Sequence, residues 1–240
     1  MSIKECEWIF FDVGETLFDE EEARLDRVRQ VIQLAKDKKI HLTEELIVQQ
    51  LIDSHNKLER HPMKSAVRNL VSGEEEREYI LSHLKYNVDL EKPYPEAEGL
   101  LKELSTRYNI GIIANQIAGT SQRLEKHGLL KYITICFSSA EVGLSKPDIR
   151  LFQKALNEAN CEPRRAVMIG DRMDNDIKPA KELGMWAVLI LQGTARFQYA
   201  HNDMVRPDDI VNNLQGIKEI FFIEGSLEDD SLQKHRARTY

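Results

Sequence analysis

The sequence of 240 residues predicts an α/β fold, in which a doubly wound parallel sheet is interrupted by an inserted helical segment. Two observations lead to this prediction. Short apolar runs typical of buried strands alternate with helical patterns after about residue 95. The stretch from about 20 to 88 shows helical spacing with no strand pattern inside it. Hydrophobic residues make up 42% of the chain, enough for a sizeable buried core.

The predicted strands are short apolar runs. Residues 8–11 form the first, an uninterrupted run that suits a strand buried on both faces. The other strands are expected at 110–114, 133–137, 166–169, 186–190 and 210–211. Helices are expected between or after them at about 96–106, 118–127, 148–159, 175–183 and 213–222. Chemistry in such sheets collects at the carboxyl ends of the strands.

The inserted segment reads as several helices. Apolar residues recur at helical spacing from Leu25 to Ala35, and Thr43 is predicted to start the next helix. Ser72 begins a sequence that fits a capping box and predicts another helix start. Pro93 marks the boundary after the insertion, because proline stops helices.

Polar residues follow the predicted strands at one edge of the sheet. They are Asp12, Asn115, Lys146, Asp171 and Asp176. Three carboxylates in a small space repel one another, and a divalent cation is the usual remedy. Oxygen ligands of this kind suit Mg²⁺. The sequence therefore predicts a magnesium site beside a lysine.

The order Asp12…Asn115…Lys146-Pro147…Gly170-Asp171-x-x-x-x-Asp176 resembles the haloacid dehalogenase-like hydrolase superfamily. The stretches SSAEVGLSKPDIRLF and GDRMDNDIKPAKELGM are similar to its branch with a helical cap. The resemblance spans about residues 7–190. It implies a Rossmann-like core over 1–18 and 92–224 and an α-helical cap over 19–91. Residues 225–240 are expected to be a polar tail.

The resemblance also implies catalytic roles. Asp12 is expected to attack phosphorus and form an aspartyl-phosphate. Lys146 is expected to neutralise charge on Asp12 and to bind the substrate phosphoryl group. Asp176 is expected to hold Lys146 or a metal-bound water. Carboxylates at strand ends also cap helices, so this structural role stays open for Asp171 and Asp176.

Binding roles follow from the same resemblance. Mg²⁺ is expected on Asp12, on the backbone carbonyl of Gly14 and on Asp171. Thr16 and Asn115 are expected to bind the substrate phosphate, with turn capping as the alternative for each.

Two positions depart from the family pattern. Gly14 stands where the family's phosphatases usually carry a second Asp, which protonates the leaving oxygen and later activates water. Such an acid/base contributes about 100- to 10,000-fold in rate. Glu15 or a water molecule is an alternative proton donor. Ala114 stands where a Ser or Thr is usual, so one hydroxyl donor to phosphate is lost.

These departures leave three functions open. The leading one is a Mg²⁺-dependent phosphatase acting on a small phosphorylated metabolite. A 2-haloacid dehalogenase is an alternative, because halide leaves without a proton, although such enzymes need no metal. The third is a binding or regulatory protein of the same fold with weakened catalysis, motivated by Gly14 and Ala114.

Composition limits the partners and compartment. The net charge of −7 argues against nucleic-acid and anionic-membrane binding, and no apolar run is long enough for a membrane span. The three cysteines are widely spaced, which favours a reduced cytoplasmic protein. The sequence does not indicate an oligomeric state.

Two further groups of residues are candidates for contact with the substrate. In the cap segment, His61, Lys64 and Arg68 lie close together in the sequence and are candidates to face the pocket, with a solvated charged face as the alternative. Gln192 and Gly193 follow the 186–190 strand and are candidates for the rim.

Overall fold

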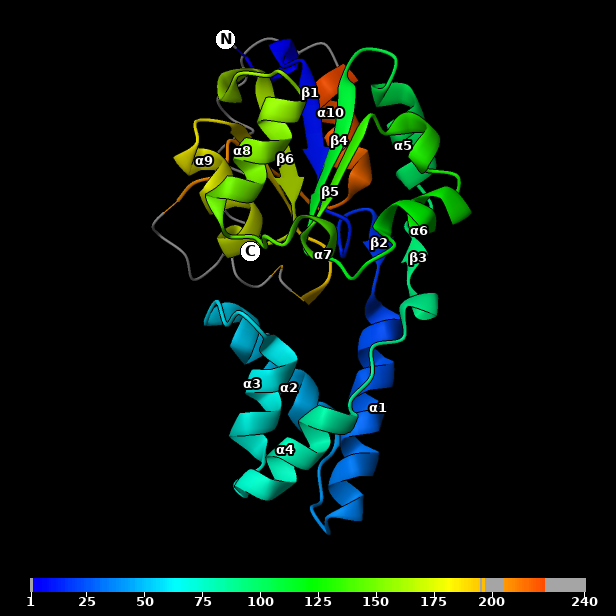
Figure 1. Ribbon diagram of the computed structural model, residues 1–240, viewed down its shortest axis with the longest axis vertical. Helices are drawn as coiled ribbons and strands as arrows, with labels where there is room; N and C mark the ends of the chain where they lie inside the picture. The colour runs from blue at the N-terminus through cyan, green and yellow to red at the C-terminus, as the bar shows by residue number, and fades with distance from the viewer. Residues whose placement is uncertain (1, 195, 197–204, 223–240) are drawn as a thin grey trace, which may run out of the picture.

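The central element of the computed structural model is a six-stranded sheet, with helices around it (Figure 1). The structure describes residues 2–194, 196 and 205–222. The strand order is β5-β4-β1-β6-β7-β8, and every neighbouring pair is parallel. The strands are β1 (Trp8–Phe11), β4 (Asn109–Ala114), β5 (Ile135–Ser138), β6 (Ala166–Gly170), β7 (Trp186–Ile190) and β8 (Asp209–Val211). The predicted fold class is confirmed.

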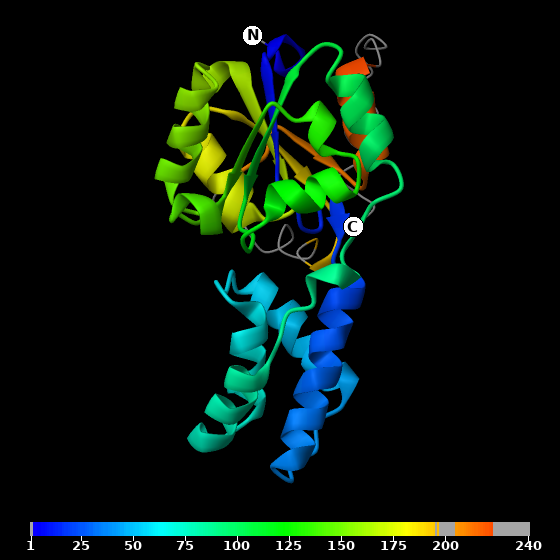
Figure 2. The same ribbon diagram turned by 45° about the vertical axis from the view of Figure 1, so that its right-hand side comes forward.

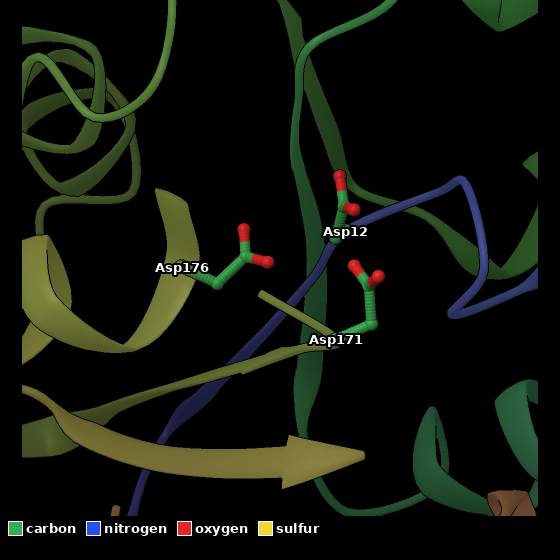
Figure 3. Close-up of side chains that lie close together, drawn as sticks. All are labelled: Asp12, Asp171 and Asp176. Carbon is green, nitrogen blue, oxygen red and sulfur yellow. The ribbon is translucent and has the colours of Figure 1, made fainter. Parts of the chain in front are cut away.

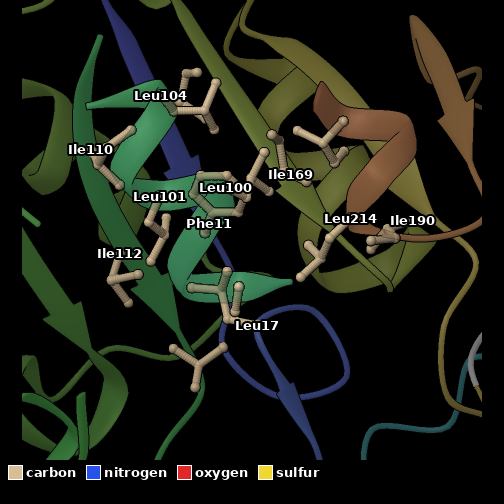
Figure 4. Close-up of a cluster of buried hydrophobic side chains, with 14 of the residues drawn as sticks. Phe11, Leu17, Leu100, Leu101, Leu104, Ile110, Ile112, Ile169, Ile190 and Leu214 are labelled. Carbon is tan, nitrogen blue, oxygen red and sulfur yellow. The ribbon is translucent and has the colours of Figure 1, made fainter. Parts of the chain in front are cut away.

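Helices cover both faces of the sheet because alternate side chains of each strand point to opposite faces. Ile9 and Phe11 contribute to one apolar cluster, whereas Trp8 and Phe10 contribute to the other. The first cluster packs against α5 (Ala97–Leu104), α6 (Thr120–Lys126) and α10 (Leu214–Phe222) (Figure 4). The second packs against α8 (Ile149–Glu158) and α9 (Lys178–Glu182).

The remaining core elements are short. They are η1 (Ile3–Glu5), η3 (Leu130–Tyr132), α7 (Ser139–Val142), η4 (Pro163–Arg165) and the π-helical turn η5 (Met173–Ile177). Several predicted bounds differ from the structure by one or two residues. The strand expected at 133–137 is β5 at 135–138, and the helix expected at 175–183 begins two residues earlier as η5. The polar tail expected at 225–240 lies outside the described residues.

The chain order creates a crevice at the carboxyl end of β1. After β1 the chain builds β4 and β5 on one side, then returns to build β6, β7 and β8 on the other. Neighbouring connections therefore diverge beside β1, which is where α/β sheets bind ligands.

The inserted segment forms a separate helical bundle beneath this edge (Figures 1 and 2). Its helices are α1 (Glu21–Asp37), α2 (Glu44–Asn56), α3 (Pro62–Leu70) and α4 (Glu74–His83), which share an apolar core of their own. Among the described residues, no helix has both the length and the apolar character needed to cross a bilayer.

Two of the predicted helix starts in this bundle can be compared with the structure. Thr43 caps α2 as predicted, since its side chain accepts a hydrogen bond from the backbone N–H of Leu46. The capping box at Ser72 was wrong, because Gly73 is the N-cap of α4 and makes no side-chain cap. The backbone carbonyl of Ser72 instead accepts a hydrogen bond from Arg77.

Two chain crossings join the bundle to the sheet domain. They are β2 (Phe18–Asp19) and β3 (Lys92–Pro93), which pair antiparallel with each other. The turn η2 (Val88–Leu90) lies between α4 and β3. Both connections to the helical bundle therefore run through one two-stranded ribbon. The predicted domain bounds at 19–91 enclose the bundle and remain a prediction.

Candidate active site at the carboxyl edge of the sheet

Three buried carboxylates meet where β1 and β6 end (Figure 3). Asp12 directly follows β1 and Asp171 directly follows β6, and these strands are hydrogen-bonded neighbours. Asp176 comes from the turn η5 just beyond β6. One carboxylate oxygen from each lies within 4.8 Å of the others. The sheet therefore brings together the three carboxylates that the sequence placed at one edge.

Lys146 is buried among these carboxylates. Its Nζ lies 2.6 Å from Oδ1 of Asp12 and 2.5 Å from Oδ1 of Asp176, with a side chain only 2% exposed. Burial opposes the charge on this ammonium, but the two carboxylates outweigh it and raise the pKa of Lys146. The lysine is thus held as a cation beside Asp12.

Asn115 holds the main chain of Lys146. Its side-chain amide donates to the Lys146 carbonyl over 2.9 Å, and its Oδ1 accepts from the Lys146 backbone N–H over 2.7 Å. Asn115 also lines the cavity described below. The structure therefore adds a positioning contact to the predicted phosphate contact, which stays a prediction.

The carboxylates differ in how many of their oxygens already accept hydrogen bonds. Both oxygens of Asp176 accept hydrogen bonds, one from Lys146 and one from the backbone N–H of Arg172. No protein donor to Asp171 is recorded among the described residues. Burial and the nearby Asp176 and Asp12 raise the pKa of Asp171 well above its usual range, an energetic cost that a cation would offset.

This donor set fits Mg²⁺. Asp12 and Asp171 would hold the ion together with the carbonyl of Gly14, and bound Mg²⁺ would neutralise charge on a phosphate group. Burial raises the pKa of Asp176 to about 6, although Lys146 lowers it. Because both of its oxygens already accept hydrogen bonds, Asp176 is better placed to hold Lys146 than to bind the metal.

The turn after β1 fixes several predicted residues. The carbonyl of Val13 accepts the backbone N–H groups of Leu17 and Phe18, each over 2.9 Å, which closes the turn. Gly14 lines the cavity. Thr16 is fully buried and is not among the cavity-lining residues, and its hydroxyl has no hydrogen-bond partner in the described part of the chain. Its predicted phosphate contact stays a prediction.

Glu15 has both carboxylate oxygens engaged. Oε1 lies 2.5 Å from Nη1 of Arg24, and Oε2 accepts the hydroxyl hydrogen of Tyr94 over 3.0 Å. Its carbonyl accepts a hydrogen bond from Gln192. Burial raises the pKa of Glu15, whereas Arg24 and Tyr94 lower it. These partners leave Glu15 poorly placed for proton transfer to a ligand.

Glu20 lies against Gly14. A Cβ atom added to Gly14 would fall 2.1 Å from Oε1 of Glu20, so this carboxyl fills the space of the absent side chain. Glu20 is partly buried and lines the same cavity as Asp12. Burial, followed by repulsion from neighbouring carboxylates of which Glu91 is the strongest, raises the pKa of Glu20 to about 8.

A cavity of about 600 Å³ separates the sheet edge from the helical bundle. Its core side includes Asp12, Gly14, Asn115, Lys146 and Asp171. Its bundle side includes Arg24, Arg27, His55, Arg60 and Tyr86. The volume is typical of a small-molecule site, and the arginines suit an anionic ligand.

Some predictions about which residues line the cavity were wrong. His61 lines the cavity, whereas Lys64 and Arg68 are exposed and do not. Gln192 does not form the rim either, because its side chain donates to backbone carbonyls in the turn after β1, and Gly193 lies against Glu15. The neighbouring Thr194 takes the rim position.

Sequence reasoning missed Glu20, Arg24 and Arg27. They are spaced four and three residues apart, so they share one face of α1 and its N-terminal extension. Arg27 lies under the ring of Tyr86, 5.8 Å from its centroid, and its Nε has no hydrogen-bond partner among the described residues. The buried Val31 continues the same face of α1, so polar residues at helical spacing on that face were the available clue.

His55 connects the two walls. Its Nε2 lies 3.0 Å from Oγ1 of Thr194, which joins α2 to the loop after β7. Burial, with Arg172 nearby, lowers the pKa of His55 to about 3. The imidazole is therefore neutral at the junction of bundle and core.

The chain is similar to curated proteins that are named as phosphatases. The chain is similar to a glyceraldehyde 3-phosphate phosphatase of Methanothermobacter thermautotrophicus, with 28% identity over 224 residues that cover 88% of this chain and 98% of that protein. It is similar to a phosphoserine phosphatase of Thermus thermophilus, with 34% identity over 102 residues that cover 42% of this chain and 41% of that protein.

Solved structures show the same fold. A haloacid dehalogenase-like family protein from Streptococcus pneumoniae superposes with a TM-score of 0.65 at 18% identity, covering 90% of this chain and 99% of that one. The family model described as haloacid dehalogenase-like hydrolase matches residues 9–190, most of the chain. The chain therefore belongs to the haloacid dehalogenase-like hydrolases.

Proposed function

We propose that this hydrolase cleaves a small phosphate monoester through attack by Asp12 on phosphorus. The contact that carries the proposal is the buried triad of Asp12, Lys146 and Asp176, open to a cavity on the Asp12 side. Lys146 orients Asp12 through their hydrogen bond, and its charge also attracts an incoming phosphate. The phosphatase names of the two relatives support the same reaction class.

The cofactor proposed is Mg²⁺, held by Asp12, Asp171 and the carbonyl of Gly14. A bound phosphate dianion would meet several negative charges at the sheet edge, and Lys146 alone does not balance them. The Asp171 carboxylate, which has no hydrogen-bond donor within the described part of the chain, supports a metal requirement and disfavours the metal-free dehalogenase alternative.

The substrate proposed is a small phosphorylated metabolite. The cavity volume suits a molecule of that size, and Arg27 and Arg60 offer positive charge opposite the phosphate site. The free thiols of Cys6, Cys136 and Cys161 support a reducing, cytoplasmic location.

The test is phosphate release from p-nitrophenyl phosphate, glyceraldehyde 3-phosphate and phosphoserine, with Mg²⁺ or with EDTA. We expect Mg²⁺-dependent release that falls at least about 1000-fold in Asp12→Asn, because the amide cannot form the acyl-phosphate. Asp37→Asn, on an exposed position of α1, is the matched control. Release that persists in Asp12→Asn, or chloride release from 2-chloropropionate without metal, would contradict the proposal. Tight phosphate binding without turnover would favour the regulatory alternative.

A further inference from the structure

The side-chain space of residue 14 is occupied by a carboxyl from elsewhere in the chain. A Cβ added to Gly14 would lie 2.1 Å from Oε1 and 2.7 Å from Cδ of Glu20. Gly14 is two residues beyond Asp12, and all three residues line the same cavity. Glu20 therefore presents its carboxyl where a side chain at position 14 would present one.

The hydrogen bonds of Glu20 fix one oxygen and leave the other open. Oε1 accepts from Nε2 of Gln116 over 3.3 Å, and Oε1 of Gln116 accepts from Nη2 of Arg123 over 2.5 Å. Ser139 exchanges hydrogen bonds with both the N–H and the carbonyl of Gln116. Within the described residues, no donor to Oε2 of Glu20 is recorded. A carboxyl held in this way can exchange a proton with a bound ligand.

Two other carboxyls near the site lack this freedom. Glu15 is bonded through both oxygens to Arg24 and Tyr94, and Asp176 is bonded through both oxygens to Lys146 and Arg172. Among the described residues, Glu20 is thus the glutamate that combines cavity contact with an open oxygen.

We propose that Glu20 is the proton-transfer residue of this hydrolase and acts from the space left by Gly14. The assignment rests on the phosphatase function proposed above. As a carboxylate oxygen of Asp12 attacks phosphorus, the ester P–O bond breaks, and the leaving oxygen takes that electron pair together with the proton of Glu20. An alcohol departs, and Glu20 is left as a carboxylate.

The second step restores the enzyme. The Glu20 carboxylate removes a proton from water as the water oxygen bonds to phosphorus. The bond between phosphorus and the Asp12 oxygen breaks, its electron pair returns to Asp12, and inorganic phosphate leaves. Glu20 is protonated again and Asp12 is again a carboxylate, so protons and electrons balance over the cycle.

The dependence on leaving group tests the proposal. p-Nitrophenolate leaves without a proton, whereas an alkoxide requires one. Glu20→Gln should therefore lower kcat on an alkyl phosphate such as glycerol phosphate by about 100- to 10,000-fold, and on p-nitrophenyl phosphate by less than about tenfold. Glu15→Gln is the matched control and should change both activities by the same factor. Equal losses in Glu20→Gln, or a selective loss in Glu15→Gln, would overturn the assignment.

Moving the carboxyl gives a second, independent test. Gly14→Asp alone should give no gain, because the new carboxyl would only displace the end of the Glu20 side chain and replace one proton-transfer group with another. The double variant Gly14→Asp/Glu20→Ala should have a kcat on the alkyl phosphate at least about tenfold higher than that of Glu20→Ala. A gain in Gly14→Asp alone, or no recovery in a folded double variant, would overturn the proposal.

The phosphatase function and the role of Glu20 can be tested separately. If wild type releases no phosphate with Mg²⁺, or Asp12→Asn stays active, the phosphatase function fails and the role of Glu20 fails with it. If wild type cleaves both substrates through Asp12 and Glu20→Gln shows no leaving-group selectivity, only the role of Glu20 fails.

Discussion

The two walls of the cavity are built on different principles. The core wall presents Asp12, Lys146 and Asp171, each fixed by the end of a buried strand or by contacts to one. The bundle wall presents Arg24 and Arg27 from a helix whose position depends on a two-stranded ribbon. The sheet therefore positions the carboxylates and the lysine, whereas the helices supply the arginines on the facing side of the cavity.

The largest expected effect is on the core wall. Lys146→Met leaves Asp12 and Asp176 buried without their shared counter-ion, so the free energy of unfolding without metal should fall by about 3–5 kcal/mol. Urea denaturation measures it. Lys154→Met, at an exposed position on α8, should shift it by less than about 0.5 kcal/mol. A loss below about 1 kcal/mol for Lys146→Met would show that the core wall tolerates unpaired charge.

The next largest effect is expected from Mg²⁺, which is proposed to bind the core wall. Mg²⁺ at 100 times its dissociation constant should raise the free energy of unfolding of wild type by about 2.7 kcal/mol. Asp171→Asn should lose this gain and should be more stable than wild type without metal, because it removes one of three crowded carboxylates. Thermal melting with Mg²⁺ or EDTA measures both. Equal stabilisation of wild type and Asp171→Asn by Mg²⁺ would show that Asp171 does not bind the metal.

A smaller effect is expected at the junction of the walls. The pKa of His55 is about 3 in the folded protein and near 6.5 in an unfolded chain. Since the folded pKa is depressed, the stability associated with neutral His55 is complete above about pH 6.5 and declines as the pH falls toward 3. The loss is about 1.4 kcal/mol per pH unit in that window.

His55→Gln removes this proton uptake. Its free energy of unfolding should therefore decline less steeply than that of wild type between pH 6 and pH 4, whereas the two slopes should agree near pH 8. Urea denaturation over this pH range measures the difference. Parallel curves throughout would show that His55 titrates equally in both states.

The same contrast explains which features the sequence could predict. Asp12 and Asp171 were predictable because parallel strands bring their carboxyl ends to one edge, whatever the details of packing. Thr43 was predictable because an N-cap is a local interaction. Glu20 was not, because its position against Gly14 depends on how the ribbon turns the chain into α1. Gln192 was misassigned because its role depends on carbonyls 176 and 177 residues away in the sequence.

The ribbon of β2 and β3 has a consequence for proton transfer. Both crossings to the bundle are paired side by side, Phe18 with Pro93 and Asp19 with Lys92, so the bundle is joined to the sheet domain at one place. Glu20 is the next residue after β2, whereas Asp12 directly follows a strand of the sheet. With Glu20 as proton donor, the acid and the nucleophile therefore come from opposite sides of that junction. The geometry of proton transfer then depends on how the ribbon holds the chain against the sheet.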